Sequence, residues 1–276
     1  MKKALSLLLL LFAAAACRGV DGPVPETFLV LEGWIDSGGH PTVLLSETMP
    51  VRDGAIGQEE MISSIAKWAK VTVSDGEQEV VLTGRLDTRY FPPYVFSTSK
   101  ITGVPGKTYS VRAEYKDYVA TAQTTIPEPV RLEAAEPRVM RDSLYTIVCR
   151  FLDPAPKGNY YKVFTMTVGQ DSRYQPSTLA MASDEVFDGM GEIMLWNTQR
   201  LMTPLYLPNI KLGDEVWVKF CTTDRQTFDF WQNYEVTLAT NANAMYFFDS
   251  DVSSNVKGAL GYWAGYGVYE YKVKVE

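Results

Sequence analysis

Short strand segments separated by turn residues recur along most of the chain, and this pattern limits the fold more than any other feature. Val71-Thr72-Val73 stops at the tight-turn signal Ser74-Asp75-Gly76, after which Glu79-Val80-Val81-Leu82 returns. Residues 107–115 and 118–122 repeat this arrangement around a two-residue turn. Short strands repeated at this spacing are typical of an antiparallel sandwich. The sequence therefore predicts an all-β fold.

A proline-rich segment, Thr125-Ile126-Pro127-Glu128-Pro129, divides the strand-rich region into two parts. The chain length suits two domains at about 100–200 residues each. The order Ala-x-Val-x-Val-x-Asp-Gly over residues 69–76, Gly-Val-Pro-Gly-Lys-x-Tyr over residues 103–109 and Thr-Thr-Ile-Pro over residues 124–127 resembles prealbumin-like modules. This resemblance implies a prealbumin-like β-sandwich over residues 27–127, and we expect a C-terminal Ig-like β-sandwich over residues 128–276. In the last strand, residues 269–275 alternate strictly, with lysines outward and aromatic residues or valines inward. The prediction is two antiparallel sandwiches in tandem.

Two segments depart from the strand pattern. Residues 223–238 place aromatic residues at helical spacing after a capping residue, Thr223 or Asp224, which predicts a short helix in the second domain. Residues 59–70 place apolar side chains such as Ile62 on one helical face. This second segment is interpreted as either a short helix or an irregular edge.

The N-terminus has the form of an export signal. Lys2 and Lys3 precede the apolar residues 4–16, a run too short to span a bilayer as a mature helix. Four alanines then lead to Cys17, which indicates a bacterial lipobox although alanine replaces its usual leucine. Residues 1–16 are therefore predicted to be removed, Cys17 to be lipidated, and residues 17–26 to form a tether. The alternative is an ordinary secretory signal with a chance cysteine.

The charge of the chain limits its partners. The formal net charge is -7, and removal of the signal with its two lysines makes it -9. An acidic chain repels phosphate backbones and anionic lipid heads, which argues against nucleic acid and against electrostatic membrane binding. No second apolar run is long enough to cross a membrane. Attachment to the membrane is therefore expected through acyl chains on the cysteine.

Two cysteines remain after the signal, and the exported compartment would permit a disulfide between them. Cys149 shares a strand face with Ile147 and is predicted to be buried, whereas Cys221 shares a face with Trp217 and is predicted to be more open. These opposite environments favour two unpaired cysteines. Strand phase alone does not exclude pairing.

Catalysis is poorly supported by the residue types present. His40 is the single histidine, and it lies in a Gly-Gly-His-Pro turn, which leaves one possible base for a triad. The sequence has no histidine cluster or CxxC pair for zinc. A carboxylate pair for glycoside cleavage remains open, although carboxylates in an acidic protein are usually solvated. We expect a protein that is not an enzyme and holds no cofactor.

Two acidic segments share part of the spacing of a calcium-binding loop. Asp184, Asp188 and Gly189 share the spacing at the start of an EF-hand loop, but Val186 occupies a ligand position. Residues 249–253 offer alternating oxygens and fail at the later positions. Both segments are interpreted as turns capped by their own side chains, with no metal.

Aromatic segments are the better candidates for binding. One places two prolines between rings, and the other places rings beside glycines. Rings presented on stiff loops suit sugar stacking or a protein hot spot. The plain alternative is packing at the sandwich ends and at the domain junction, which is favoured because most large rings are substantially buried. The candidate residues are Tyr90, Phe91, Tyr94, Tyr262, Trp263 and Tyr266.

Several segments together resemble a known family. In chain order they are residues 30–35, 69–76, 159–161, 184–189 and 254–263. The chain is similar to the "domain of unknown function 4249" family of exported lipoproteins of Bacteroidota, and its N-terminal half also resembles carboxypeptidase-regulatory or prealbumin-like modules. The resemblance implies an outer-membrane lipoprotein, often associated with TonB-dependent receptors, with no established activity or catalytic residues.

The residues after the cysteine do not decide whether the protein faces the periplasm or the cell surface. Arg18 follows Cys17 where the inner-membrane retention signal of proteobacterial lipoproteins has aspartate. Surface-export signals are acidic at this place, and here only Asp21 qualifies.

The functional hypothesis is an accessory lipoprotein at the outer membrane that binds without catalysis and assists a TonB-dependent nutrient transporter. The alternative is a surface module that binds a glycan or peptide by itself. A cryptic hydrolase would need a compact carboxylate pair in a cleft.

Overall fold

The structure is a computed structural model that describes residues 27–49, 58–141, 144–187, 189–195, 197–198, 210–240 and 253–276. The predicted signal, Cys17 and the predicted tether lie outside the described residues. The first half holds β1 (Leu29–Asp36), β2 (Thr42–Glu47), α2 (Gln58–Ser63), β3 (Lys70–Ser74), β4 (Glu79–Val81), β5 (Thr83–Leu86), β6 (Tyr94–Ser97), β7 (Thr108–Tyr115) and β8 (Tyr118–Thr125). The second half holds β9 (Leu132–Arg141), β10 (Leu144–Leu152), β11 (Tyr160–Thr167), β12 (Gln175–Ser183), β13 (Met190–Leu195), β14 (Asn197–Thr198), β15 (Ile210–Lys211), β16 (Glu215–Thr223), α3 (Arg225–Thr240) and β17 (Leu260–Lys274).

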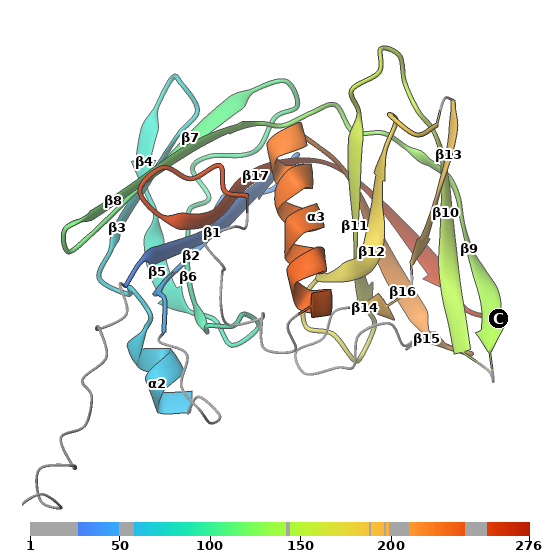
Figure 1. Ribbon diagram of the computed structural model, residues 1–276, viewed down its shortest axis with the longest axis horizontal. Coiled ribbons are helices and arrows are strands. Elements are labelled where there is room, and N and C mark those ends of the chain that lie inside the picture. Colours follow the sequence, from blue (N-terminus) through green and yellow to red (C-terminus); the bar gives the residue numbers. More distant parts are fainter. Residues whose placement is uncertain are drawn as a thin grey trace, which may run out of the picture.

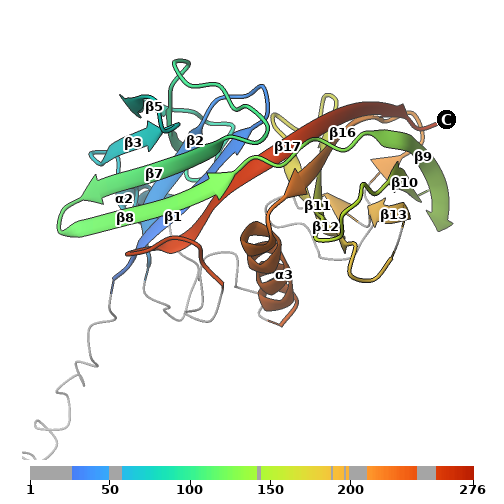
Figure 2. The same cartoon turned by 90° about the horizontal axis from the view of Figure 1, so that it is seen from above.

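A nine-stranded sheet passes through both halves of the molecule and is called the shared sheet below. Its strand order is β14-β12-β11-β16-β17-β1-β2-β6-β5. The 15-residue strand β17 joins the halves, and Figure 2 shows it running from one to the other. Its first part pairs in parallel with β1, from Val30↔Leu260 to Asp36↔Tyr266. Its second part pairs antiparallel with β16, from Glu215↔Lys274 to Thr222↔Gly267.

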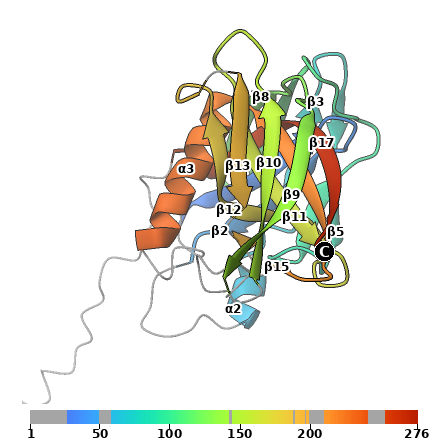
Figure 3. The ribbon, with the colours of Figure 1, turned by 90° about the vertical axis from the view of Figure 1, so that its right-hand side faces the viewer.

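Two smaller sheets cover one face of the shared sheet, here called the core face. The sheet β4-β3-β7-β8 packs on the first half, and β10, paired with β9, β13 and β15, packs on the second. Figure 3 shows β13, β10 and β9 side by side, nearest to the viewer. Successive side chains of β17 point to opposite faces of the sheet. Those on the core face contribute to both cores, because Trp263 packs in the first core and Val273 in the second. The residues that carry the two cores include Leu31, Ile35, Val73, Tyr109, Val111, Ile147, Phe151, Val163, Val218 and Phe220.

Trp263 shows how the first core is built. Its side chain is fully buried, and its indole Nε1 donates to the backbone oxygen of Tyr109 at 3.0 Å. Gly33 lies beside it on β1, and a Cβ there would stand 2.8 Å from the indole Cε3. The glycine therefore makes room for the largest side chain of the core.

The opposite face of the shared sheet, here called the helix face, carries α3. Helix α3 begins after Asp224, whose Oδ1 accepts the backbone N–H of Thr227 at 2.8 Å. Its buried side chains Phe230 and Trp231 pack on Tyr262 and Tyr266 of β17. Figure 1 shows α3 in front of the region where the two halves meet.

The all-β fold class is confirmed, and the strands predicted at residues 71–73, 79–82 and 107–115 match β3, β4 and β7 within one residue at each end. The helix predicted over residues 223–238 is also confirmed, with Asp224 as its cap. At residues 59–70 the structure has a shorter helix, α2, followed by a turn into β3. Strand β12 and three short strands were not predicted, and neither was the parallel pairing of β1 with β17. The division at residue 127 places Trp263 in the second half, whereas its ring packs in the first core.

Both described cysteines are free and fully buried. The prediction that Cys149 and Cys221 are unpaired is therefore confirmed. The prediction that Cys221 is open is wrong, because its face of β16 is the helix face. Burial raises the pKa of the Cys149 thiol to about 12 and also raises that of Cys221, so neither is a thiolate at neutral pH.

Candidate functional site

The second aromatic segment is part of a strand. Tyr262, Trp263 and Tyr266 lie on β17 and are exposed by 4%, 0% and 2%. The prediction that a loop presents these rings is wrong. They pack in the interior, as the alternative interpretation expected. The nearby glycines serve a different purpose: a Cβ at Gly267 would stand 2.4 Å from the backbone oxygen of Pro127. They allow the segment that joins the halves to cross β17 closely.

The first aromatic segment runs from the turn after β5 into the first residue of β6, and its rings are half-buried. Tyr94 belongs to the first core, where it meets Phe96 edge-on at 5.4 Å between ring centroids. Phe91 precedes Pro92 in the turn. Tyr90 points elsewhere, because its ring lies 6.0 Å from that of Trp34 on the helix face. Tyr90 thus reaches the junction between the halves while staying partly accessible.

A group of side chains on the helix face joins the two halves around Tyr90. It is called the junction cluster and consists of Glu32, Trp34, Tyr90, Arg173 and Tyr174, all half-buried. The Arg173 guanidinium carbon lies 5.0 Å from the Tyr90 ring centroid. Its Nε also donates to the backbone oxygen of Arg89 at 2.9 Å, and its Nη1 donates to that of Tyr174 at 3.2 Å. One arginine of the second half therefore holds a turn of the first half.

The charges of the junction cluster are partly withdrawn from water. Burial raises the pKa of the Glu32 carboxyl, although attraction to Arg173 and a hydrogen bond from the Tyr262 hydroxyl, at 3.1 Å, oppose this. The Tyr174 hydroxyl donates to Glu270 at 2.6 Å. The cluster thus presents the Tyr90 ring beside two guanidiniums, those of Arg173 and Arg89, with the half-buried Glu32 carboxyl nearby.

A buried ion pair lies beside the junction cluster. Lys219 Nζ is 2.6 Å from Asp36 Oδ2, and the ammonium lies 5.4 Å from the ring centroid of Phe164 and 5.5 Å from that of Tyr266. Burial is the largest single influence and lowers the pKa of Lys219, but the attraction and hydrogen bond to Asp36, together with weaker attractions that include Glu270, outweigh it, so the net shift is upward. The other oxygen of Asp36, Oδ1, has no hydrogen-bond partner although it is buried.

A second buried ion pair ties α3 to the sheet. Lys162 is fully buried, and its Nζ lies 2.7 Å from Glu235 of α3 and 2.7 Å from the backbone oxygen of Ser177. Glu235 also accepts the backbone N–H of Leu179 at 2.9 Å. Burial lowers the pKa of Lys162, and Glu235 only partly opposes this.

The other residues considered in the sequence have structural partners. His40 lies in an exposed turn, with Nδ1 2.8 Å from the backbone oxygen of Ile101. Asp184 is buried, and its Oδ2 accepts the backbone N–H groups of Gly158 and Asn159 at 2.8 and 3.0 Å. Asp188 and residues 249–252 lie outside the described residues. Within the described ranges, no group of three His, Cys, Asp or Glu side chains could hold a metal ion.

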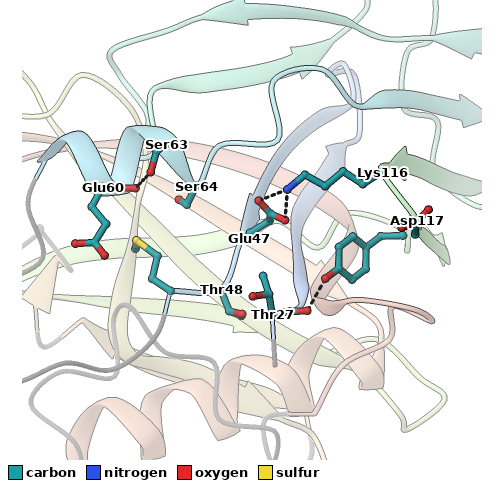
Figure 4. Close-up of a pocket in the computed structure, with 10 residues that line it drawn as sticks. Thr27, Glu47, Thr48, Glu60, Ser63, Ser64, Lys116 and Asp117 are labelled. Atoms are coloured by element: carbon teal, nitrogen blue, oxygen red, sulfur yellow. Dashed lines mark hydrogen bonds and ion pairs between the residues drawn. The ribbon is translucent and has the colours of Figure 1, made fainter. Parts of the chain in front are cut away.

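A polar pocket lies at the end of the first sandwich where the described chain begins. Its volume is about 670 Å³, and Figure 4 shows hydroxyl and carboxylate side chains around it. Lys116 Nζ contacts both oxygens of Glu47 on its wall, at 2.7 and 2.9 Å, and the Tyr118 hydroxyl donates to the backbone oxygen of Thr27 at 2.6 Å. These contacts neutralise the lysine and order the start of the chain.

Sequence reasoning missed Trp34, Arg173, Tyr174 and both buried lysines. The lysines had a usable signal, because Lys162 and Lys219 each interrupt an otherwise apolar or aromatic strand, as in Tyr160-Tyr161-Lys162-Val163-Phe164. A charge inside such a run indicates a buried partner. Arg173 lies in the connection between β11 and β12, and no local sequence pattern there indicates a contact with a distant residue.

A family model matches most of the chain. The family model described as "Domain of unknown function (DUF4249)" matches residues 20–272. No curated protein matches the chain.

Proposed function

The chain belongs to the DUF4249 family, a domain of unknown function, and from this premise we propose that it is a lipid-anchored binding protein of the outer membrane that does not catalyse a reaction. In this proposal Cys17 carries the lipid, and the junction cluster contacts the partner. The protein assists a TonB-dependent transporter by capping it or by presenting a nutrient.

The junction cluster is the observation that supports a binding role. The Tyr90 ring lies between the Trp34 ring and the Arg173 guanidinium carbon, at 6.0 and 5.0 Å, so side chains from both halves of the molecule meet there. Aromatic and arginine side chains dominate the binding energy of protein interfaces, and small-molecule sites favour places where domains meet. The ionisable groups nearby are engaged in pairs, as Lys219 with Asp36, which supports binding more than proton transfer.

The sequence before the described residues supports the anchor. Cys17 directly follows a charged, apolar and small-residue signal, and Thr27 is the tenth residue after it. Among the helices that the structure describes, none is both long and apolar enough to cross a bilayer. Several acyl chains on one cysteine give a stable attachment.

An affinity purification from membranes in mild detergent tests the transporter role. We expect a TonB-dependent receptor to copurify with the lipidated protein and to be lost with Cys17→Ala. We also expect Tyr90→Ala to weaken its recovery strongly. Tyr115→Ala is the matched control, because Tyr115 is another half-buried ring with a cation, Lys116, at 5.0 Å, but outside the junction. Recovery of the protein without any membrane partner would refute the accessory role.

A ligand array separates the alternative of a glycan- or peptide-binding module. The soluble domain would then be retained on the array by itself, and Tyr90→Ala would abolish retention while Tyr115→Ala preserved it. Stacking on an aromatic ring suits a sugar, and the arginine suits a carboxylate. Retention that is unchanged by Tyr90→Ala would place the ligand elsewhere on the surface.

A further inference from the structure

Trp68 is the most exposed aromatic side chain among the large apolar residues that the structure describes. It is 82% exposed, at the tip of a tight turn between α2 and β3. The turn is held on both sides of its tip, by Lys67 N–H to the oxygen of Ile65 at 2.8 Å and by Ala69 N–H to the oxygen of Ala66 at 3.0 Å. Ala66 itself is fully buried in the first core. The backbone therefore fixes an indole in solvent, where tryptophan is rarely found without a partner.

Other exposed apolar side chains lie at the same end of the sandwich. Ile62 of α2 is 46% exposed, and Phe28, at the start of the described chain, is 41% exposed. Backbone hydrogen bonds connect their segments, because Glu47 N–H donates to Ser64 and Thr48 N–H donates to Phe28, both at 2.8 Å. Figure 1 shows α2 close to the start of β1. Phe28, Ile62 and Trp68 are together called the entry face.

The charges around the entry face suit a lipid surface without net charge. Lys67 lies beside the indole, with Nζ 5.8 Å from the ring centroid, and Lys70 is exposed at the start of β3. Long lysine side chains can keep the ammonium in water while their stems lie in the headgroup region. Exposed Glu59 on α2 offsets part of this positive charge, so the face is not a polybasic patch for anionic lipid.

The length of the tether limits what lies against this face. Ten residues at about 3.3–3.6 Å each span at most about 35 Å, so a lipid on Cys17 keeps Thr27 within that distance of the bilayer. Phe28 directly follows Thr27, and the rest of the entry face adjoins it. A bilayer is therefore the surface that the entry face meets most often. Tryptophan is also the side chain enriched at membrane–water interfaces.

We infer that the entry face rests on the bilayer, with the Trp68 indole among the lipid headgroups. The inference rests on the proposed lipid anchor and adds a second contact to it. Two contacts restrict rotation about the tether, so the junction cluster is held in a defined direction relative to the membrane. The expected lipid is zwitterionic, because the contact depends on apolar and interfacial side chains.

Quenching of tryptophan fluorescence by brominated lipids tests this contact. The full lipidated protein is reconstituted into phosphatidylcholine vesicles whose acyl chains carry bromine, and its emission is compared with that in unbrominated vesicles. We expect clear quenching in the native protein and loss of most of it in Trp68→Phe. Trp217→Phe is the matched control, because Trp217 is half-buried on β16 of the other half, and this change should leave the quenching unaltered.

Two outcomes would overturn the inference, and they are distinguishable. Quenching that is equal in Trp68→Phe and in the native protein would show that Trp68 does not touch lipid, while the anchor stands. Failure of the native protein to float with vesicles would refute the anchor itself, and the inference would fall with it. Amide hydrogen exchange on the lipidated protein without substitutions gives a second measurement, and we expect slower exchange at residues 65–69 when vesicles are bound.

Discussion

The two faces of the shared sheet use the same strands for different purposes. On β17, the core face presents Trp263 and Val273 to two apolar cores, whereas the helix face presents Tyr262, Tyr266 and Glu270. The core face is closed by two further sheets, and apolar burial there needs no particular partner. The helix face buries charges and hydroxyls that each require one partner with suitable geometry. One face therefore supplies stability, and the other supplies specific contacts between the halves.

The largest effect is expected on the core face. Trp263→Ala should lower the free energy of unfolding by about 3–5 kcal/mol, because it removes a fully buried indole and leaves a cavity beside Gly33. Tyr262→Phe, one residue away on the helix face, removes a single hydrogen bond and should cost about 0.5–1.5 kcal/mol. Urea unfolding followed by circular dichroism measures both. Equal losses in the two variants would contradict the distinction between the faces.

The next effect concerns the buried charge pair on the helix face. Lys162→Met should cost about 3 kcal/mol, because it leaves Glu235 buried without its cation. The double variant with Glu235→Gln should recover part of the loss, since the amide is neutral and can still accept the Leu179 N–H. The same urea experiment applies. No recovery in the double variant would show that lost packing, and not the uncompensated charge, dominates at this site.

A smaller effect depends on pH and reports on Glu32. Its pKa is raised in the folded state, so the folded protein binds more protons than the unfolded one between the two pKa values. The contribution of Glu32 to the free energy of unfolding is fully present below its pKa in the unfolded chain. It is lost as the pH rises through its pKa in the folded protein. Glu32→Gln should therefore be more stable than the native protein at pH 8 and equal to it near pH 4. A stability difference that does not change between these pH values would contradict the shift.

The smallest effect on stability is expected from Tyr90 of the junction cluster. Tyr90→Ala removes a half-buried ring and its contact with Arg173, and should cost about 0.5–1 kcal/mol for the cation–π interaction. Binding should suffer far more than stability if this ring contacts the partner. Thermal unfolding measured beside the purification experiment separates the two. A loss of several kcal/mol would mean that Tyr90 has a mainly structural role.

Local signals in the sequence were sufficient for most elements. The Asp75-Gly76 turn is present, with Gly76 at a φ of +88°, because glycine alone adopts this backbone angle without strain. The cap of α3 at Asp224 is present for a similar local reason, since a short carboxylate reaches the first free N–H groups. Strand β12 was missed because its burial pattern is irregular and its pairing with β11 contains a bulge.

The candidate site was predicted only in part. Tyr90 was identified as a ring on a proline-stiffened turn, and it does lie at the junction. Its partner Arg173 is 83 positions away in the chain, so no local pattern could connect them. The glycine-flanked rings were misplaced because glycine marks a close backbone approach as well as a loop.

The sequence by itself determined the all-β fold class, the turns and the helix α3, because each depends on neighbours in the chain. Only the tertiary structure decided that β17 pairs in parallel with β1 and antiparallel with β16, and which face of each strand is covered. Pairing between distant strands depends on the packing of whole faces, as when Gly33 makes room for Trp263. The burial of Lys162 and Lys219 follows from that packing, since each charge is tolerated only where folding brings its partner within hydrogen-bond distance.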